Sequence, residues 1–119
     1  MDKKYFHSKK TLETFERWNH MLKMQIKTKD EIANTLTRYY GYQTSGTSII
    51  IDEKKITLPI SKLVGVVRRM TPIECERLQG FPDNWTKGVS DTQRYRQCGN
   101  AVTINVVDTI IKKMNKVIK

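Results

Sequence analysis

The spacing of apolar residues predicts a helix near the N-terminus. Between Thr11 and Met24, the apolar side chains of Phe15, Trp18 and Leu22 recur at intervals of three and four residues. These intervals place the three side chains on one face of a helix. We therefore expect this helix to dock through that face on the rest of the protein.

Short apolar and β-branched runs in the middle of the chain predict strands. Residues 32–40 are rich in threonine and tyrosine, and residues 48–51 are a serine followed by three isoleucines. Such residues favour strands, and the turn-rich residues 41–46 between the two runs indicate a hairpin. Residues 56–58 and 63–67 are two further strand candidates.

Capping signals predict a helix that begins after Thr71. Pro72 suits the first helical position because it has no N–H to leave unpaired, and Glu74 completes a capping box with Thr71. Gly80 allows the helix to end, so the helix is expected to stop near Gln79. Arg77 lies three residues after Glu74, which is a spacing at which the two side chains can pair.

Two more helices are expected at the C-terminal end. Ser90 and Gln93 are spaced as a second capping box, which predicts a short helix ending near Gly99. Thr103 is a candidate cap for a final helix with a wide apolar face formed by Val106, Val107, Ile110, Ile111, Met114, Val117 and Ile118. The predicted fold is α+β, with a small strand-rich region followed by C-terminal helices.

Net charge adds a preference for anionic partners. The 119 residues include 22 Lys and Arg against 12 Asp and Glu, which gives a formal charge of +10. This excess of positive charge attracts polyanions, chiefly nucleic acid or an anionic membrane, although a solvated basic surface also accounts for the charge. The length of the chain limits it to one domain at most.

Cysteine and hydropathy patterns exclude several classes of protein. Cys75 and Cys98 are too few for a disulfide framework, and neither lies near His7 or His20, so a metal site is not expected. The start of the chain lacks the pattern of a signal peptide, and no run approaches the roughly 20 apolar residues of a membrane span. These features predict a cytoplasmic protein with reduced thiols.

Residues 69–102 resemble the last two motifs of DNA cytosine-5 methyltransferases. The first motif, Arg-x-Leu-Thr-Pro-x-Glu-x-x-Arg-Leu-Gln-Gly-Phe-Pro-Asp, is matched from Arg69 to Asp83 with Met70 in place of leucine. The second, Gln-x-Gly-Asn-x-Val, is matched from Gln97 to Val102.

Residues 33–40 and 48–51 are more weakly similar to the segment that leaves the target recognition domain of this family. The resemblance divides the chain into an unassigned lead-in and helix (residues 1–32), the end of the recognition domain (residues 33–67) and the C-terminal methyltransferase motifs with the closing helix (residues 68–119).

The resemblance implies one part of an S-adenosylmethionine site. It places Asn100 and Ala101 against the cofactor, and it places Gly99 at the edge of the pocket for a cytosine flipped out of the duplex. Many family members carry serine where this chain has Ala101, so any hydroxyl contact there is lost. Spacing alone favours an ordinary helix C-cap at Gly99.

No catalytic residue is predicted in this chain. In the family the nucleophilic cysteine follows a proline, whereas the prolines here precede Ile60, Ile73 and Asp83. The Phe-x-Gly-x-Gly cofactor loop and the Glu-Asn-Val motif are also missing from the sequence. Cys75 and Cys98 are expected to be inert packing residues, and the chain is expected to be inactive alone.

Three hypotheses follow for the function. The chain is the small subunit of a split methyltransferase that acts on double-stranded DNA, with a larger chain supplying the missing motifs. Alternatively, it is a truncated relic or a fragment of a longer open reading frame, with no partner made. Or it is a free-standing basic DNA-binding module, whose phosphate contacts would come from Arg38, Arg68, Arg69, Arg94 and Arg96.

Overall fold

The computed structural model describes residues 2–17, 26–40, 47–55 and 57–118. Its α-helices are α1 (Lys9–Arg17), α3 (Pro72–Gln79), α4 (Asp91–Asn100) and α5 (Ile104–Ile118). Its strands are β1 (Ile26–Lys27), β2 (Ser48–Ile50) and β3 (Val67–Arg69), and its short 3₁₀ helices are η1 (Lys3–Tyr5), η2 (Glu53–Lys55) and η3 (Ile60–Lys62). The predicted α+β class is confirmed.

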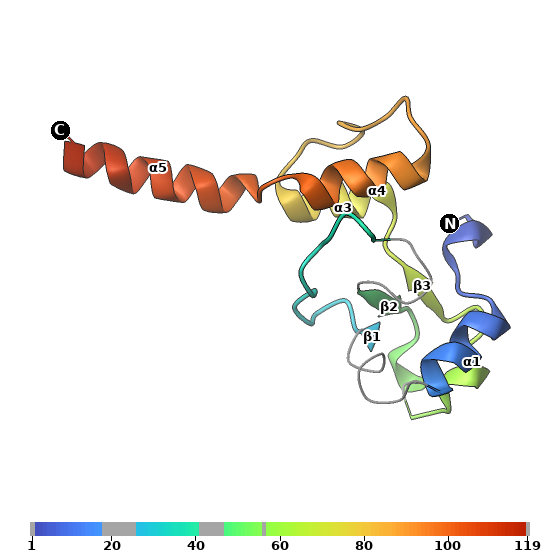
Figure 1. Cartoon of the computed structure of the whole chain (residues 1–119). Helices are drawn as coiled ribbons and strands as arrows, with labels where there is room; N and C mark the ends of the chain where they lie inside the picture. Colours follow the sequence, from blue (N-terminus) through green and yellow to red (C-terminus); the bar gives the residue numbers. More distant parts are fainter. Residues whose placement is uncertain (1, 18–25, 41–46, 56, 119) are drawn as a thin grey trace.

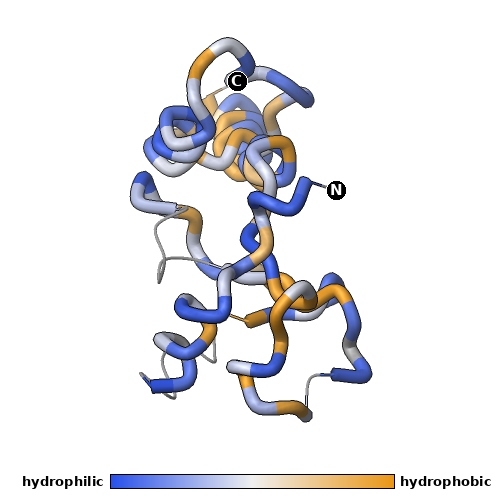
Figure 2. Tube along the Cα trace, turned by 90° about the vertical axis from the view of Figure 1, so that its right-hand side faces the viewer, coloured by the Kyte–Doolittle hydropathy of each residue, from blue (hydrophilic) through white to orange (hydrophobic). Residues whose placement is uncertain are grey.

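The elements form two packed groups and one projecting helix (Figure 1). Helix α1 packs against η3 beside the small sheet, and α3 packs against α4. Helix α5 extends away from both groups, which gives the molecule an elongated shape of 58 × 31 × 23 Å. This helix, seen nearly end-on in Figure 2, carries both apolar (orange) and polar (blue) positions.

The three strands form one sheet in the order β1-β2-β3. Strand β2 runs parallel to β1, with Ser48 opposite Ile26, and antiparallel to β3, with Ile49 opposite Arg68. The predicted hairpin between residues 32–40 and 48–51 is therefore wrong.

Residues 32–37 have no regular structure and residues 38–40 form a turn. Tertiary contacts override strand propensity here: the Asn34 amide donates to Thr47 Oγ1 at 2.8 Å, and the Tyr40 hydroxyl donates to the Thr47 carbonyl.

Two other predicted elements also differ from the structure. Residues 57–58 form a turn and a bend, while residue 56 lies outside the described residues. The predicted strand at residues 63–67 is mostly the turn that follows η3, and β3 begins only at Val67. Gly65, with φ 77°, makes this turn possible because glycine tolerates a left-handed backbone.

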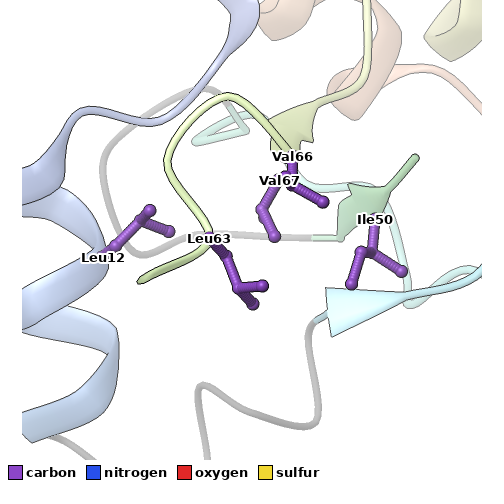
Figure 3. Close-up of a cluster of buried hydrophobic side chains, with 5 residues drawn as sticks. All are labelled: Leu12, Ile50, Leu63, Val66 and Val67. Atoms are coloured by element: carbon purple, nitrogen blue, oxygen red, sulfur yellow. The ribbon is translucent and has the colours of Figure 1, made fainter. Parts of the chain in front are cut away.

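Two hydrophobic cores hold the groups together. The first consists of Leu12, Ile50, Leu63, Val66 and Val67 (Figure 3). Leu12 of α1 is fully buried in this core, so the N-terminal helix packs on it through Leu12. Docking through the face of Phe15, Trp18 and Leu22 stays a prediction, since Trp18 and Leu22 lie outside the described residues. The second core consists of Tyr40, Met70, Cys75, Tyr95 and Cys98.

Two tyrosines fix the junction between the sheet and α3. The Met70 amide donates to the Tyr40 hydroxyl at 2.6 Å, and the Tyr95 hydroxyl donates to the Met70 carbonyl at 2.7 Å. The two rings meet edge to face with centroids 5.2 Å apart, a favourable aromatic geometry. Both backbone polar groups of Met70 are thus satisfied inside the second core.

The predicted helix boundaries of the C-terminal part are confirmed. Thr71 Oγ1 accepts from the Glu74 amide, and the Glu74 carboxylate accepts from the Thr71 amide, which completes the capping box. Gly80 ends α3 with φ 83°. Ser90 Oγ accepts from the Gln93 amide at the start of α4.

Candidate functional site

Three separate stretches of the sequence meet at one open groove of about 500 Å³. Its lining comes from residues 32–36, from the end of α3 at Leu78 and Gln79, and from Gly99 and residues 101–103. The second sequence motif thus forms one wall, with Leu78 and Gln79 of the first motif beside it. Of the residues predicted from the resemblance, Gly99 and Ala101 line the groove, whereas Asn100 is exposed between them.

Gln79 ties α3 to the turn between α4 and α5. Its amide nitrogen donates to the Cys98 carbonyl at 2.7 Å and to the Ala101 carbonyl at 3.3 Å. Its amide oxygen accepts from the Thr103 hydroxyl at 2.7 Å. The hydroxyl proposed as a cap for α5 is therefore directed to Gln79.

Gly99 allows α4 to lie directly on the backbone of residues 37 and 38. A Cβ atom at Gly99 would lie 2.1 Å from the Thr37 carbonyl carbon and 2.2 Å from the Arg38 nitrogen. Backbone atoms cannot move aside as a flexible side chain can, so only glycine fits. Close approach to the chain's own backbone therefore accounts for this glycine.

Glu76 is a buried carboxylate that organises the loop after α3. It is fully buried and accepts from the amides of Asn84 and Thr86, from the Thr86 hydroxyl, and from Arg94 at 3.1 Å. Burial alone would raise its pKa, but the hydrogen bonds from Thr86, Arg94 and Asn84 outweigh burial and lower the pKa of Glu76. The loop it holds presents Trp85, which is 65% exposed and stacks on Phe81.

The predicted pairing of Arg77 with Glu74 is wrong. Arg77 instead binds Asp83 through two hydrogen bonds of 2.8 and 2.6 Å. Glu74 is bound by both terminal nitrogens of Arg68 at 2.8 Å. The bidentate geometry of a guanidinium on a carboxylate selects these partners over the i, i+3 pair.

The five arginines considered for DNA contact lie in different environments. Arg38 is exposed beside the ring of Tyr39. Arg69 lies over the rings of Tyr5 and Tyr95. Arg96 is half-buried on α4.

Buried ion pairs engage the other two arginines. Arg68 is only 6% exposed and is bound to Glu74, and Arg94 is bound to Glu76. Their geometry favours a structural role.

The two cysteines are buried in the second core. Burial raises the pKa of the Cys75 thiol and of the Cys98 thiol, which keeps both protonated at neutral pH. Within the described residues, no cluster of His, Cys, Asp and Glu could hold a metal ion.

Gln79 and Glu76 are the site residues that sequence analysis missed. The helical spacing contained a signal for them, because Pro72, Cys75, Glu76 and Gln79 fall on one face of α3 and are all buried. Two polar residues on a predicted buried face require partners, and these partners lie eight or more residues along the chain.

Solved structures share this fold. The crystal structure of the Dnmt2 methyltransferase of S. pombe superposes with a TM-score of 0.77 at 22% identity, over 99% of this chain and 39% of that one. The methyltransferase EhMeth of Entamoeba histolytica superposes with a TM-score of 0.72 at 19% identity, over the whole of this chain and 38% of that one. The fold is therefore that of one part of a methyltransferase.

Sequence comparison gives the family. The family model described as C-5 cytosine-specific DNA methylase matches residues 1–116. The chain is 39% identical over 90 residues to the type II methyltransferase M1.ScrFI of Lactococcus lactis subsp. cremoris, and 39% identical over 82 residues to M.SsoII of Shigella sonnei. These matches cover 75% and 68% of this chain, and 20% and 18% of the relatives. The chain belongs to the C-5 cytosine-specific DNA methylase family and spans about a fifth of these relatives.

Proposed function

We propose that the chain acts as the C-terminal part of a DNA (cytosine-5)-methyltransferase, as a small subunit whose nucleophile comes from a separate, larger chain. Residues 33–67 then form the end of the target recognition domain. Residues 68–119 contribute one wall of the S-adenosylmethionine site and the closing helix. The observation that carries this proposal is the uncovered apolar face of α5.

Helix α5 has none of its residues buried. Its apolar side chains share one side of the helix and are 39 to 85% exposed: Ile104, Val106, Ile110, Ile111, Met114, Val117 and Ile118. A helix with such a wide apolar face is normally covered by another element. About four-fifths of the length of M1.ScrFI has no counterpart in this chain, so a larger methyltransferase chain is the partner that we propose for this face.

The proposed docking face adjoins the groove. A second hollow of about 290 Å³ is lined by Val102, Ile104, Val107, Asp108 and Ile111. Val102 lines both hollows, so a chain seated on α5 would stand beside the wall formed by residues 99–103. Docking would thereby complete the cofactor site from the other side.

The groove suits one wall of a cofactor site. Its volume of about 500 Å³ falls in the usual range for small-molecule sites, and its mixed lining of apolar side chains and a few polar groups is typical of them. We propose that Ala101 and the adjacent Asn100 hold S-adenosylmethionine and that Gly99 borders the base pocket. The cofactor supplies the methyl group, and the residues of this chain only bind and orient it.

Double-stranded DNA is the proposed substrate. The charge of +10 favours binding to phosphates, and exposed Arg38 is the strongest candidate among the five arginines considered. We place Arg69 and Arg96 next, since both are half-buried. Arg68 and Arg94 come last because carboxylates already engage them.

Complementation tests the proposal. The larger chain would be the product of a neighbouring reading frame that carries the Pro-Cys and Phe-x-Gly-x-Gly motifs. Transfer of a labelled methyl group to double-stranded DNA is measured for this chain, for the larger chain and for the mixture. We expect transfer only from the mixture, because this sequence contains no Pro-Cys pair. Methyl transfer by this chain alone would contradict the proposal.

A matched pair of α5 variants tests the docking face. Ile111→Asp places a charge on the apolar face, whereas Thr109→Asp places the same charge on the polar face. Both positions are exposed, so neither change should alter the fold of this chain. We expect Ile111→Asp to weaken binding to the larger chain at least about a hundredfold, as for a buried interface anchor, and Thr109→Asp to leave binding within about twofold. Equal effects would rule out this face.

A free-standing DNA-binding module is the second candidate, favoured only by the net charge. Its affinity for DNA would fall steeply with salt and would not depend on Ile111. DNA binding without any interaction with a methyltransferase chain would support it.

A further inference from the structure

We infer that Gln79 is a positioning residue, which holds the turn of residues 98–103 in the shape that forms one wall of the groove. This inference rests on the proposed function, because the wall is the proposed cofactor contact. Gln79 does not itself need to touch the cofactor. It would act through Ala101, whose backbone it holds.

All hydrogen-bonding ends of the Gln79 side chain are engaged with this turn. Its two N–H groups point to the carbonyls of Cys98 and Ala101, and its oxygen accepts from Thr103. Carbonyl oxygens can only accept, so the amide nitrogen must face them. The side chain thus spans the last residues of α4 and the residue that precedes α5.

The burial of Gln79 increases the contribution of its hydrogen bonds to the stability of the turn. The residue is only 6% exposed, and its bond to Cys98 is buried. A buried carbonyl that accepts no hydrogen bond destabilises a fold, so the hydrogen bonds donated by Gln79 stabilise the turn. The Ala101 amide donates back to its own helix, to the Gln97 and Cys98 carbonyls. The Ala101 carbonyl instead accepts from Gln79, which links this turn to α3.

Amide hydrogen exchange on the full chain tests the local role. The amides of Ala101, Val106 and Val107 are hydrogen-bonded within or beside the turn, and those of Ile51 and Val67 serve as references in the first core. We expect Gln79→Ala to lower protection about tenfold or more at the first three. A factor of ten corresponds to about 1.4 kcal/mol, the size of one net hydrogen bond. Protection at the references should not change.

One further variant and one control sharpen this test. Thr103→Val removes one of the three bonds, so it should give a smaller loss at the same amides, and it serves if Gln79→Ala does not fold. Gln93→Ala changes an exposed glutamine on α4 and should have no effect. No change in Gln79→Ala, or an equal loss at Ile51 and Val67, would overturn the inference.

Gln79→Glu provides a readout that general destabilisation would not produce. A carboxylate cannot donate to the Cys98 carbonyl, so protection of the turn should fall at pH 8. A protonated carboxylic acid can donate, and burial favours that form. Protection factors at Ala101, Val106 and Val107 should therefore recover as the pH is lowered toward 5. If there is no recovery, the donor role assigned to Gln79 is wrong.

The functional consequence is measured in the mixture with the larger chain. We expect Gln79→Ala to raise KM for S-adenosylmethionine at least about fivefold while kcat changes by less than about twofold, since a positioning residue affects binding of the cofactor. An unchanged KM would overturn the inference. If even the unaltered mixture shows no transfer, the proposed function fails, while hydrogen exchange still decides whether Gln79 holds the turn.

Discussion

Gly99 shows at the scale of one residue how a motif position serves the fold. Its lack of a side chain makes room for the backbone of residues 37 and 38, which lies 2.1 to 2.2 Å from where a Cβ would be. This contact brings the segment before Tyr40 against the α4 helix, next to the groove that residues 32–36 and Gly99 line. A base-pocket role for Gly99 remains a proposal beside this structural one.

Gly99→Ala is therefore expected to destabilise the chain. The added methyl group forces α4 away from the backbone of residues 37 and 38, and overpacking of this kind costs about 1–3 kcal/mol. Urea denaturation measures the free energy of unfolding. Thr92→Ala, at an exposed position of the same helix, serves as the control and should change it by less than about 0.5 kcal/mol. Equal stability of both variants would show that the contact is absent in solution.

His7 gives a second prediction at this scale, on pH. Burial, followed by the nearby charge of Arg69, lowers the pKa of His7 from 6.5 to about 4. Its ring lies 2.8 Å from the Ser48 hydroxyl, beside the sheet. Between these two pKa values the unfolded chain binds a proton that the folded chain does not, so stability rises with pH there. We expect about 1–3 kcal/mol to be lost as the pH falls from 6.5 toward 4.

Carboxylates such as Glu76 also lose stability in acid, so His7 must be separated from them. In His7→Gln, the part of the loss between pH 6.5 and 5 should disappear, because carboxylates with lowered pKa values titrate below that window. Denaturation curves at several pH values measure this difference. A loss of the same size in the variant would show that His7 is not the group responsible.

At the scale of elements, α3 organises the C-terminal part of the molecule. One polar side chain on its buried face, Gln79, reaches the α4–α5 turn, and another, Glu76, reaches the loop of residues 84–86. Glu74, which completes its capping box, is bound by Arg68 from β3. The short helix thereby connects the sheet, the loop and the groove.

Glu76→Gln should loosen the loop as well as lower stability. The neutral amide keeps the shape of the side chain, but it leaves Arg94 without its anionic partner and places N–H groups against the amides of Asn84 or Thr86. Removing one member of a buried pair costs about 3–5 kcal/mol. Urea denaturation measures this cost, and the fluorescence anisotropy of Trp85 in a Trp18→Phe background reports the motion of the loop. Glu16→Gln, on an exposed face of α1, is the control.

At the scale of the whole molecule, apolar side chains are buried in the two cores but exposed along α5. Two cores are closed by tertiary contacts, whereas α5 keeps its apolar face in solvent. None of the described helices is long and apolar enough to cross a membrane. A protein surface is the kind of partner that we propose for this face.

An isolated 15-residue helix without tertiary support is marginally stable in water. We therefore expect the amides of residues 108–116 to exchange much faster than those of α4 in the chain alone. They should become protected by at least about tenfold when the larger chain is added. Strong protection of α5 in the chain alone, at concentrations where it is monomeric, would contradict the proposal that the helix needs a partner.

The sequence by itself determined the family resemblance, the α+β class and the C-terminal helices, because the N-caps at Thr71 and Ser90 and the periodicity of α5 act within a few residues. It did not determine the strand pairing, since residues 32–40 follow tertiary hydrogen bonds rather than their β-propensity. Only the tertiary structure decided that Glu74 also binds Arg68, and which partners Glu76, Arg77 and Gln79 bind. The sequence offers several possible partners for each of these side chains. Burial and bidentate geometry decide which partner is bound, so a residue distant in the sequence can be bound in place of a neighbour along the chain.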